Sequence, residues 1–233
     1  MTGIIGAMES EVRILISKLE NAKEQIIGRN VYYTGLLCGK EVVIARCGIG
    51  KVAAAVSAQI MIDRFGADLV INTGIAGGLA KGIGIGDIVI ASGLIQHDFD
   101  LSLFGYAKGY IPGFDQQDRN VPTVFKADGE TVGKLECAAK KLGVNCKTGV
   151  IVSGDIFVCD SAKKNELVSL FGAYATEMEG AAIAEAACLS GVPFAVIRAI
   201  SDSADEEATE SFDTFEEKAA GVSSSMILEF LAL

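Results

Sequence analysis

Short apolar runs alternate with amphipathic stretches along the whole chain. Five runs, rich in small and β-branched residues and too short for helices, predict strands at 2–6, 68–72, 87–96, 146–153 and 193–200. Segments that are alanine-rich or repeat apolar residues every three or four positions predict helices over 8–19, 51–65, 128–142, 161–171, 178–188 and 213–231. No linker or repeat divides this alternation, so it predicts one α/β domain over residues 1–233.

The segments between these elements are strand-like, glycine-rich or irregular. Residues 25–38 and 41–47 predict two more strands, and the glycines of 73–78 predict a tight turn, with or without a ligand. The glycines of 47–51 open a helix, but their spacing is wrong for a Walker phosphate loop. The stretch 97–126 has no clear pattern, and loops of this length in compact domains are usually functional or interfacial.

The apolar run 193–200 carries one arginine, Arg198, and stops abruptly at Ser201 and Asp202. Its shortness and β-branched residues are typical of a strand buried on both faces of a sheet. Ligands of open α/β sheets bind beyond the carboxyl ends of such strands. Asp202 is therefore a candidate acid or base, although a carboxylate here could also only cap the following helix.

Two glutamates stand out on predicted helices. Glu11 falls among the inward-facing apolar residues of its helix, one turn after a strand. Burial raises the pKa of an unpaired carboxylate, as at many active sites, although a buried salt bridge with Arg198 would explain the same position. Glu179 lies in the predicted first turn of its helix, where the helix dipole favours the ionised form. A dipole-stabilised surface glutamate is the alternative there.

Composition narrows the possible functions. A net charge of −10 argues against binding to nucleic acid or an anionic membrane. The N-terminus lacks the basic segment of a signal peptide, and no apolar run has the ~20 residues of a membrane helix, so we expect a cytoplasmic protein. The six cysteines form no metal or disulfide pattern and are expected to be reduced and mostly buried. With His97 as the only histidine, we expect carboxylate chemistry with no metal and no cofactor.

Six motifs, in order and spanning nearly the whole chain, resemble the 5′-methylthioadenosine/S-adenosylhomocysteine nucleosidase family. They are Gly6-Ala-Met-Glu-Ser-Glu11, Gly48-Ile-Gly-Lys-Val52, Asn72-Thr-Gly-Ile-Ala-Gly-Gly78, Ser153-Gly-Asp155, Glu177-Met-Glu179 and Arg198-Ala-Ile-Ser-Asp202. The resemblance implies a single-domain, three-layer α/β/α nucleoside phosphorylase-like fold with a central mixed, twisted sheet. It further implies a homodimer, a role in methionine salvage, and irreversible hydrolysis of the N-glycosidic bond of 5′-substituted adenosines, small-molecule substrates.

The resemblance also assigns catalytic roles to individual residues. Asp202 would protonate N7 of the departing purine as a general acid, with Ser201 orienting it. Glu11 would position and deprotonate the attacking water, helped by Arg198, and Glu179 would hold the ribose hydroxyls. Neutralising the leaving base allows the ribose to become oxocarbenium-like, and general acid catalysis of this kind contributes roughly 10²–10⁴-fold.

The remaining matched positions would bind the substrate. Met178 would pack against the sugar, Phe157 would stack on adenine, and the backbone of Val158 would read the Watson–Crick edge of the base. Other pocket positions are Met8, Ile49, Ile75, Ala76, Gly77 and Phe212. The wall around the 5′-substituent, supplied in part by the neighbouring subunit, would consist of Leu101, Phe104 and Pro112.

The chain departs from the family at Ile75, where a small polar serine is usual, and in the loop containing residues 114–118. Three alternatives to the hydrolysis of 5′-substituted adenosines are therefore retained. The first is hydrolysis of another purine nucleoside such as futalosine. The second is phosphorolysis, disfavoured because Glu9 and Glu11 occupy the turn where phosphorylases need arginines. The third is a non-catalytic adenine-nucleoside binding protein.

Overall fold

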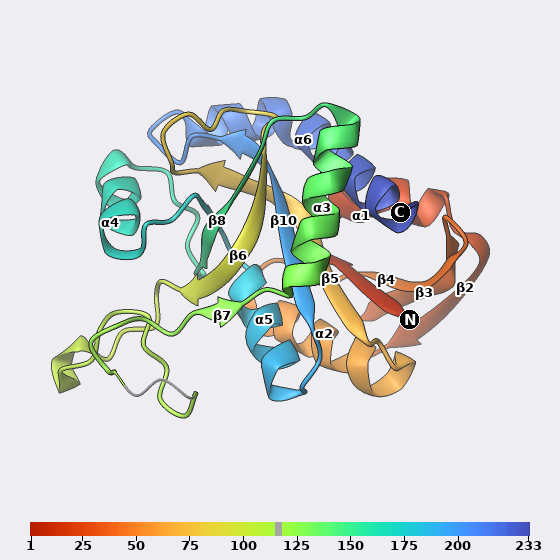
Figure 1. Ribbon diagram of the computed structural model, residues 1–233, viewed down its shortest axis with the longest axis horizontal. Helices are drawn as coiled ribbons and strands as arrows, with labels where there is room; N and C mark the ends of the chain where they lie inside the picture. The colour runs from red at the N-terminus through yellow and green to blue at the C-terminus, as the bar shows by residue number, and fades with distance from the viewer. Residues whose placement is uncertain (115–117) are drawn as a thin grey trace.

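The computed structural model describes residues 1–114 and 118–233 (Figure 1). Its helices are α1 (Glu9–Ser17), α2 (Lys51–Phe65), the 3-10 helix η1 (Ser102–Phe104), α3 (Gly129–Leu142), α4 (Ser161–Phe171), α5 (Gly180–Leu189) and α6 (Ala208–Leu231). Its strands are β1 (Thr2–Gly6), β2 (Glu20–Ile27), β3 (Asn30–Leu37), β4 (Lys40–Arg46), β5 (Leu69–Gly78), β6 (Ile88–Gln96), β7 (Phe125–Lys126), β8 (Cys146–Ser153), β9 (Ala175–Glu177) and β10 (Phe194–Asp202).

The strands in the described part of the chain form one mixed sheet of ten strands. Its order is β10-β6-β8-β9-β5-β1-β4-β3-β2, with β7 paired to β6. Strand β10 also pairs with β5, so that β10, β6, β8, β9 and β5 close on themselves into a small barrel. Strands β1 and β10 run parallel to β5, which brings the carboxyl ends of these strands to the same edge.

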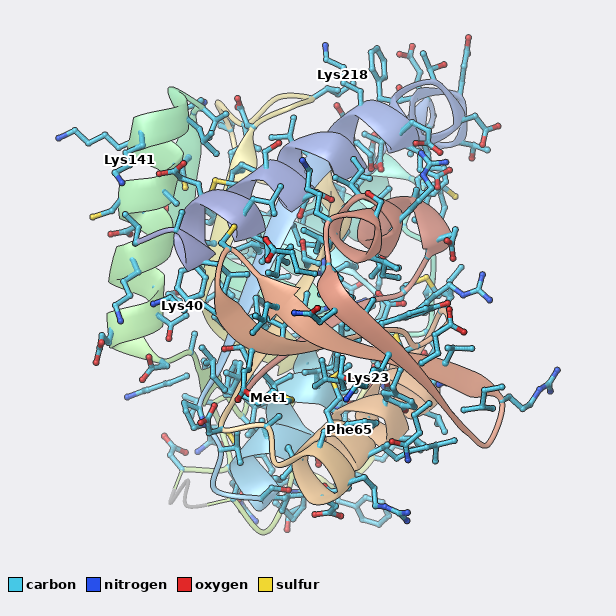
Figure 2. All side chains as sticks on the ribbon, turned by 90° about the vertical axis from the view of Figure 1, so that its right-hand side faces the viewer. Met1, Lys23, Lys40, Phe65, Lys141 and Lys218 are labelled. Carbon is cyan, nitrogen blue, oxygen red and sulfur yellow. The ribbon has the colours of Figure 1, made fainter. Side chains whose placement is uncertain are left out.

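Helices cover both faces of this sheet, as Figure 1 shows, with α1, α3 and α6 on one side and α2 and α5 on the other. Successive residues of a strand point to opposite faces. Accordingly Ile4 of β1 packs with the α1, α3 and α6 side chains, whereas Ile5 packs with those of α2 and α5. In Figure 2, strands β2 to β4, marked by Lys23 and Lys40, twist across the edge of the sheet beneath α6. The predicted three-layer α/β/α fold is confirmed, and the barrel closure adds to it.

Several element boundaries differ from the sequence prediction. Residues 25–38 do not form one strand, because a Gly28-Arg29 turn with Gly28 at φ +63° divides the region into the hairpin β2–β3. The glycines of 73–78 do not make a tight turn but continue β5 to Gly78. Strand β10 likewise includes Ser201 and Asp202, and α6 begins five residues earlier than predicted.

The cysteines also depart from expectation. All six are free, but Cys38, Cys137, Cys159 and Cys188 are exposed, and only Cys47 is buried. The prediction that most of them fill the core was therefore wrong. A thiol is small enough to be tolerated at the surface of a helix or turn, so residue type alone did not predict its burial.

In residues 97–114 and 118–126, the structure is irregular apart from η1 and β7. Three residues of the atypical 114–118 segment, 115–117, lie outside the described residues. Within the described part of the chain, no helix is both long and apolar enough to cross a membrane.

Candidate active site

An open cleft lies at the edge where β1, β5 and β10 end. It encloses about 510 Å³ of empty space, its mouth included. The residues that line it are Ala7, Met8, Glu11, Ile49, Ile75, Ala76, Gly77, Phe157, Thr176, Glu177, Met178, Glu179, Ser201, Asp202 and Phe212. Most of the lining is apolar, and the polar exceptions are mainly carboxylates. The surroundings of each carboxylate determine its pKa and therefore the chemistry that it can perform.

Glu11 projects into the cleft from the first turn of α1. Its Oε2 accepts hydrogen bonds from the backbone N–H groups of Ala7 (2.6 Å) and Met8 (2.9 Å), and its Oε1 accepts one from Ile75 (3.0 Å). The side chain is 4% exposed. Burial raises the pKa of Glu11, opposed by the charge of Arg198 and by the three backbone donors. Once ionised, Glu11 is therefore a stronger base than a free glutamate.

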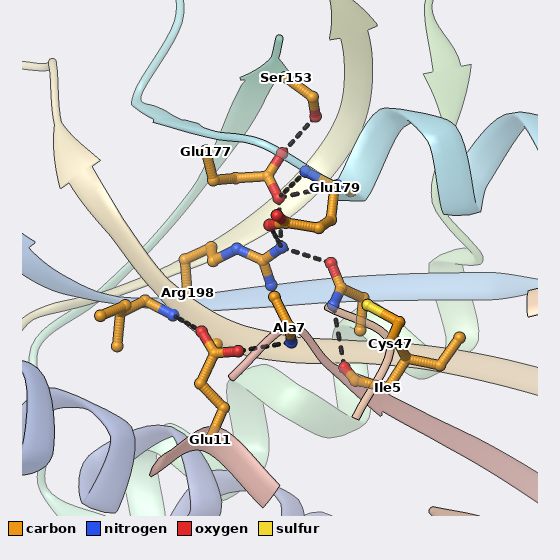
Figure 3. A network of polar contacts seen from close by, with 12 residues as sticks. Ile5, Ala7, Glu11, Cys47, Ser153, Glu177, Glu179 and Arg198 are labelled. Carbon is orange, nitrogen blue, oxygen red and sulfur yellow. Dashed lines mark hydrogen bonds and ion pairs between the residues drawn. The ribbon is translucent and has the colours of Figure 1, made fainter. Parts of the chain in front are cut away.

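Arg198 lies within β10, beneath the cleft rather than in its lining. Its guanidinium donates to Glu177 and to Asn72, and to the carbonyl oxygen of Ile197 at 3.0 Å. The hypothesis of a direct salt bridge from Arg198 to Glu11 was wrong, because Glu177 takes that place. Figure 3 shows the guanidinium between Glu177 and Glu179 on one side and Glu11 on the other.

Glu177, at the end of β9, organises the wall beside Arg198. Ser153 donates its hydroxyl to Oε1, while Oε2 accepts from the backbone of Glu179 (3.0 Å) and Gly180 (2.7 Å) and from Arg198. These backbone donors are the free N–H groups at the start of α5. The buried carboxylate thus joins β8, β9, α5 and β10 into one rigid wall.

Glu179 is the N-cap residue of α5 and therefore lies one position before the first turn, not within it as predicted. Its Oε1 accepts from the backbone of Gly50 at 2.9 Å, and its Oε2 lies 4.0 Å from Arg198 Nη2. Burial and the neighbouring Glu177 raise the pKa of Glu179 to about 8, opposed by Arg198 and Gly50. The expectation that the helix dipole favours its ionised form was wrong, because desolvation outweighs the dipole here.

Asp202 is the last residue of β10 and is 2% exposed. Its Oδ2 accepts from the Ser201 hydroxyl and its Oδ1 from the Ala204 backbone, both at 2.8 Å. Ala204 adopts a left-handed conformation, φ +50°, which is uncommon for a residue with a side chain. Asp202 does not cap α6, whose N-cap is Glu207. Burial raises the pKa of Asp202, so its carboxyl retains a proton to higher pH than a free aspartic acid.

Two glycines of β5 make room for these carboxylates. Gly74 pairs with Arg198 across the sheet, and a Cβ on Gly74 would overlap Oε1 of Glu11. A Cβ on Gly77 would come within 2.9 Å of Asp202 Oδ1. These glycines therefore do not form a turn. They are needed because side chains from other elements come close to the extended backbone of β5.

Aromatic side chains form the outer end of the cleft. Phe157 follows β8 and meets Phe212 of α6 edge to face, with ring centroids 5.8 Å apart. Beside them lies a smaller pocket of about 230 Å³, lined in part by Val158, Phe157 and Asp202. A flat aromatic ring between these groups would be in reach of Asp202.

Most of the predicted site residues gather in this cleft, including Met8, Ile49, Met178 and Ser201. Arg198 stands behind it, and Val158 lines the adjoining pocket. Leu101, Phe104 and Pro112 do not line the cleft of a single chain. Sequence reasoning gave no role to Glu177, Ser153 and Asn72, although each stands in one of the quoted motifs. A polar residue at the end of a predicted strand was the signal that could have found them.

Comparison with known proteins identifies the family of this chain. The profile of the Phosphorylase superfamily matches residues 2–232. A 5′-methylthioadenosine/S-adenosylhomocysteine nucleosidase from Exiguobacterium sp. is 43% identical, over 97% of this chain and 95% of that protein. The chain belongs to this nucleosidase family.

Two solved structures extend the comparison. The Neisseria meningitidis 5′-methylthioadenosine/S-adenosylhomocysteine nucleosidase in complex with methylthio-immucillin-A has a TM-score of 0.93 and 44% identity, covering 99% of this chain and 98% of that one. A futalosine hydrolase mutant of Helicobacter pylori has a TM-score of 0.91 and 38% identity, covering 98% and 97%. The nucleosidase family membership and the fold inferred from the six motifs are thus confirmed.

Across the described residues, no group of three His, Cys, Asp or Glu side chains is arranged to hold a metal ion. The chemistry that the site offers is that of buried carboxylates with altered pKa values, facing an apolar and aromatic cleft. This combination suits proton transfer to and from a largely apolar, partly aromatic ligand.

Proposed function

We propose that this protein hydrolyses the N-glycosidic bond of 5′-substituted adenosines, such as 5′-methylthioadenosine and S-adenosylhomocysteine, releasing adenine and the 5′-substituted ribose. The main observation in support is that two buried carboxylates, Glu11 and Asp202, line the same cleft. Glu11 accepts a hydrogen bond from Ile75 of β5, and Asp202 pairs with Gly77 of the same strand. These two points on β5 are two residues apart, which corresponds to about 7 Å along a strand. This separation leaves room for a glycosidic bond and a water molecule between them.

The proposed reaction needs an acid at one end and a base at the other. Asp202 gives its proton to purine N7, so that the C1′–N9 bond breaks with its electron pair on a neutral base. Glu11 takes a proton from water, whose oxygen forms the new bond to C1′. The raised pKa of each carboxyl favours its role, because Asp202 keeps its proton to higher pH than a free aspartic acid and ionised Glu11 is a stronger base than a free glutamate.

The remaining groups would bind and orient the nucleoside. Glu179 would accept hydrogen bonds from the ribose hydroxyls, with Met178 against the sugar. Phe157 would stack on the base and the Val158 backbone would read its edge, in the pocket that both share with Asp202. Arg198 would act through its charge on Glu11, because its hydrogen bonds go to Glu177 and Asn72.

Water is favoured over phosphate as the nucleophile. Four carboxylates line the cleft, and its described lining includes no basic side chain. A phosphate dianion would be repelled at such a surface. The substitution at Ile75 leaves hydrolysis possible, since Ile75 holds Glu11 through its backbone N–H.

A second candidate is hydrolysis of another purine nucleoside, such as futalosine, by the same groups. The likeness to the Helicobacter pylori futalosine hydrolase supports it. An apolar side chain at position 75, beside the attacking water, is the feature of this chain that could change the preferred nucleoside.

We further infer a homodimer. Exposed apolar side chains gather at the start of α2, where Ile49, Val52 and Val56 are 59%, 77% and 51% exposed. Ile49 also lines the cleft, so a partner that covers this face would reach the cleft mouth. Leu101, Phe104 and Pro112 would complete the 5′ wall from that partner. The four exposed free thiols favour a reducing compartment, in support of a cytoplasmic enzyme. The proposed substrates would place this enzyme in methionine salvage.

The test is release of free base from methylthioadenosine, adenosylhomocysteine, 5′-deoxyadenosine and futalosine, each with and without phosphate. We expect adenine release from the first two at rates that phosphate does not change. Strict dependence on phosphate would establish phosphorolysis instead. Hypoxanthine release from futalosine alone would select the second candidate, and tight binding without base release would indicate a binding protein.

A further inference from the structure

The cleft continues into a groove that the proposed chemistry does not use. This groove shares Ala7, Met8 and Ile49 with the cleft and encloses about 690 Å³, open to solvent. Beyond the shared residues it is lined by Glu9, Asn30, Arg46, Cys47 and Gly48. We call it the charged groove. Its lining comes from the start of α1, the end of β4 and the start of β3, at the side of the sheet that carries the β2–β3 hairpin (Figure 1).

The charged groove adjoins a different part of the cleft from the 230 Å³ pocket beside Phe157, which we call the purine pocket. The purine pocket shares Asp202, Phe157 and Met178 with the cleft, but no residue with the charged groove. A nucleoside with its base beside Asp202 and its ribose beside Glu179 would therefore direct its 5′-substituent past Met8 and Ile49 into the groove. This orientation rests on the proposed function.

The groove contains an arginine, whereas the described lining of the cleft has no positively charged side chain. Arg46 Nη1 lies 3.8 Å from Oε2 of Glu9, and the two side chains are 59% and 60% exposed. A second pocket of about 370 Å³ adjoins Glu9, Asn30 and Arg46 and adds Arg29 from the hairpin turn. Two arginines at one place are notable in a chain with a net charge of −10. The cleft's four carboxylates would repel a ligand carboxylate, whereas Arg46 would attract one.

The exposed Arg46–Glu9 pair is also easy to open. Exposed ion pairs contribute little to stability, because water solvates both partners well. A ligand with an anionic and a cationic group on neighbouring atoms could therefore replace each partner at small cost. Guanidinium binds carboxylate through two parallel hydrogen bonds, and a carboxylate accepts well from ammonium.

We propose that the charged groove is the binding subsite for the α-amino acid end of a 5′-substituent. Arg46 binds the α-carboxylate, Glu9 binds the α-ammonium, and Asn30 offers its amide beside them. In S-adenosylhomocysteine the α-carbon is the third carbon after the sulfur, so this tail would extend beyond a thioether placed beside Met8. Arg46 and Glu9 thereby determine how well the enzyme takes adenosylhomocysteine relative to methylthioadenosine, which has no charged tail.

The test compares kcat/KM for adenosylhomocysteine and for methylthioadenosine in the wild type, Arg46→Gln and Glu9→Gln. We expect each substitution to lower the adenosylhomocysteine to methylthioadenosine ratio by about three- to tenfold, the size of one charged hydrogen bond near a surface. The loss should lie in KM, since the tail is far from the reacting bond. Arg13→Gln is the matched control, because Arg13 belongs to a similarly exposed ion pair, with Glu217, outside these pockets.

A decarboxylated adenosylhomocysteine, which keeps the ammonium but lacks the carboxylate, sharpens the assignment. Its turnover relative to methylthioadenosine should respond to Glu9→Gln but not to Arg46→Gln. An unchanged substrate ratio in both variants would overturn the proposal. If the wild type cleaved neither nucleoside, the proposed function would fail separately. The subsite would then be tested by the ratio of dissociation constants for the two ligands, with and without Arg46→Gln.

Discussion

At the scale of single residues, the site is a set of four buried carboxylates held by different partners. Glu177 is neutralised by Arg198, whereas Glu11 and Asp202 are held mainly by backbone N–H donors and a hydroxyl. Taking a carboxylate out of water is expensive unless a charge or several donors replace the water. Burial raises the pKa values of Glu11, Glu179 and Asp202, and the charge of Arg198 opposes this shift only at Glu11 and Glu179.

The acid role of Asp202 predicts a large effect of a small change. Asp202→Asn keeps the shape and the hydrogen bond from Ala204 but cannot supply the proton, so kcat should fall by roughly 10²–10⁴-fold. The measurement is adenine release under saturating methylthioadenosine, with thermal unfolding to check the fold. Asp205→Asn, in the same turn but outside the cleft lining, is the control. Near-normal kcat in Asp202→Asn would remove Asp202 from the mechanism.

Glu179 predicts a pH dependence of stability. Its folded pKa of about 8 lies above the model-compound value of 4.5. The stability that comes from the protonated form is therefore complete below about pH 4.5 and is lost as pH rises through about 8. Each unit of pKa difference corresponds to about 1.4 kcal/mol.

Glu179→Gln has no proton to lose, so the wild type should lose stability relative to this variant between pH 5 and pH 8.5. Urea unfolding at both pH values measures the difference. Glu130→Gln, at an exposed position on α3, should leave the pH profile as it is. Parallel profiles for the wild type and Glu179→Gln would show that Glu179 titrates normally.

At the scale of elements, β5 and β10 extend beyond their apolar runs, and the added residues are the ones that form the site. Strand β5 continues through Gly74 and Gly77 past Glu11 and Asp202, and β10 ends on Asp202 itself. The ladder between β5 and β10 fixes both catalytic candidates relative to one rigid backbone. Helix starts provide other donors, because Met8, the N-cap of α1, donates to Glu11, and Gly50, the N-cap of α2, donates to Glu179.

This arrangement predicts that Gly74 is essential for activity. In Gly74→Ala the new methyl would overlap the Glu11 carboxylate and displace it from its bond to Ile75. Adenine release should fall by at least about tenfold, because misplacement of a catalytic group by ~1 Å can cost about 10²-fold. Gly133→Ala, on open helix surface, should keep full activity and gain slight stability. Full activity in Gly74→Ala would show that Glu11 can move without consequence.

At the scale of the whole molecule, the closed strands of the barrel make one wall of the site rigid, while the apolar face of α2 at the mouth stays uncovered. If that face forms the homodimer, a charge there should separate the subunits. Val56→Asp should shift the protein from dimer to monomer in sedimentation velocity and should lower activity, because the partner's part of the 5′ wall is lost.

Ile26→Asp is the matched control for Val56→Asp, since Ile26 is 73% exposed on β2, away from α2. It should leave the sedimentation coefficient unchanged. A Val56→Asp protein that sediments as the wild type does would place the interface elsewhere or exclude it.

The fold class, the family and most of the residues that line the cleft could be predicted from the sequence. Apolar periodicity encodes which face of an element is buried, and the six motifs encode the site, so both are readable along the chain. These patterns did not predict the β2–β3 turn, the length of β5 or the burial of the cysteines. The length of β5 and the burial of the cysteines depend on contacts between segments far apart in the chain, whereas the β2–β3 turn is local and has the single glycine Gly28 as its signal.

The partner that each charged group takes, by contrast, could not be predicted before the segments were placed in three dimensions. Arg198 pairs with Glu177 rather than Glu11, and Glu179 loses its preference for the ionised form. The charged groove likewise exists only because β4, β3 and α1 bring Arg46, Asn30 and Glu9 together. Desolvation and Coulomb interactions act through space, between groups whose separation cannot be read from their order along the chain.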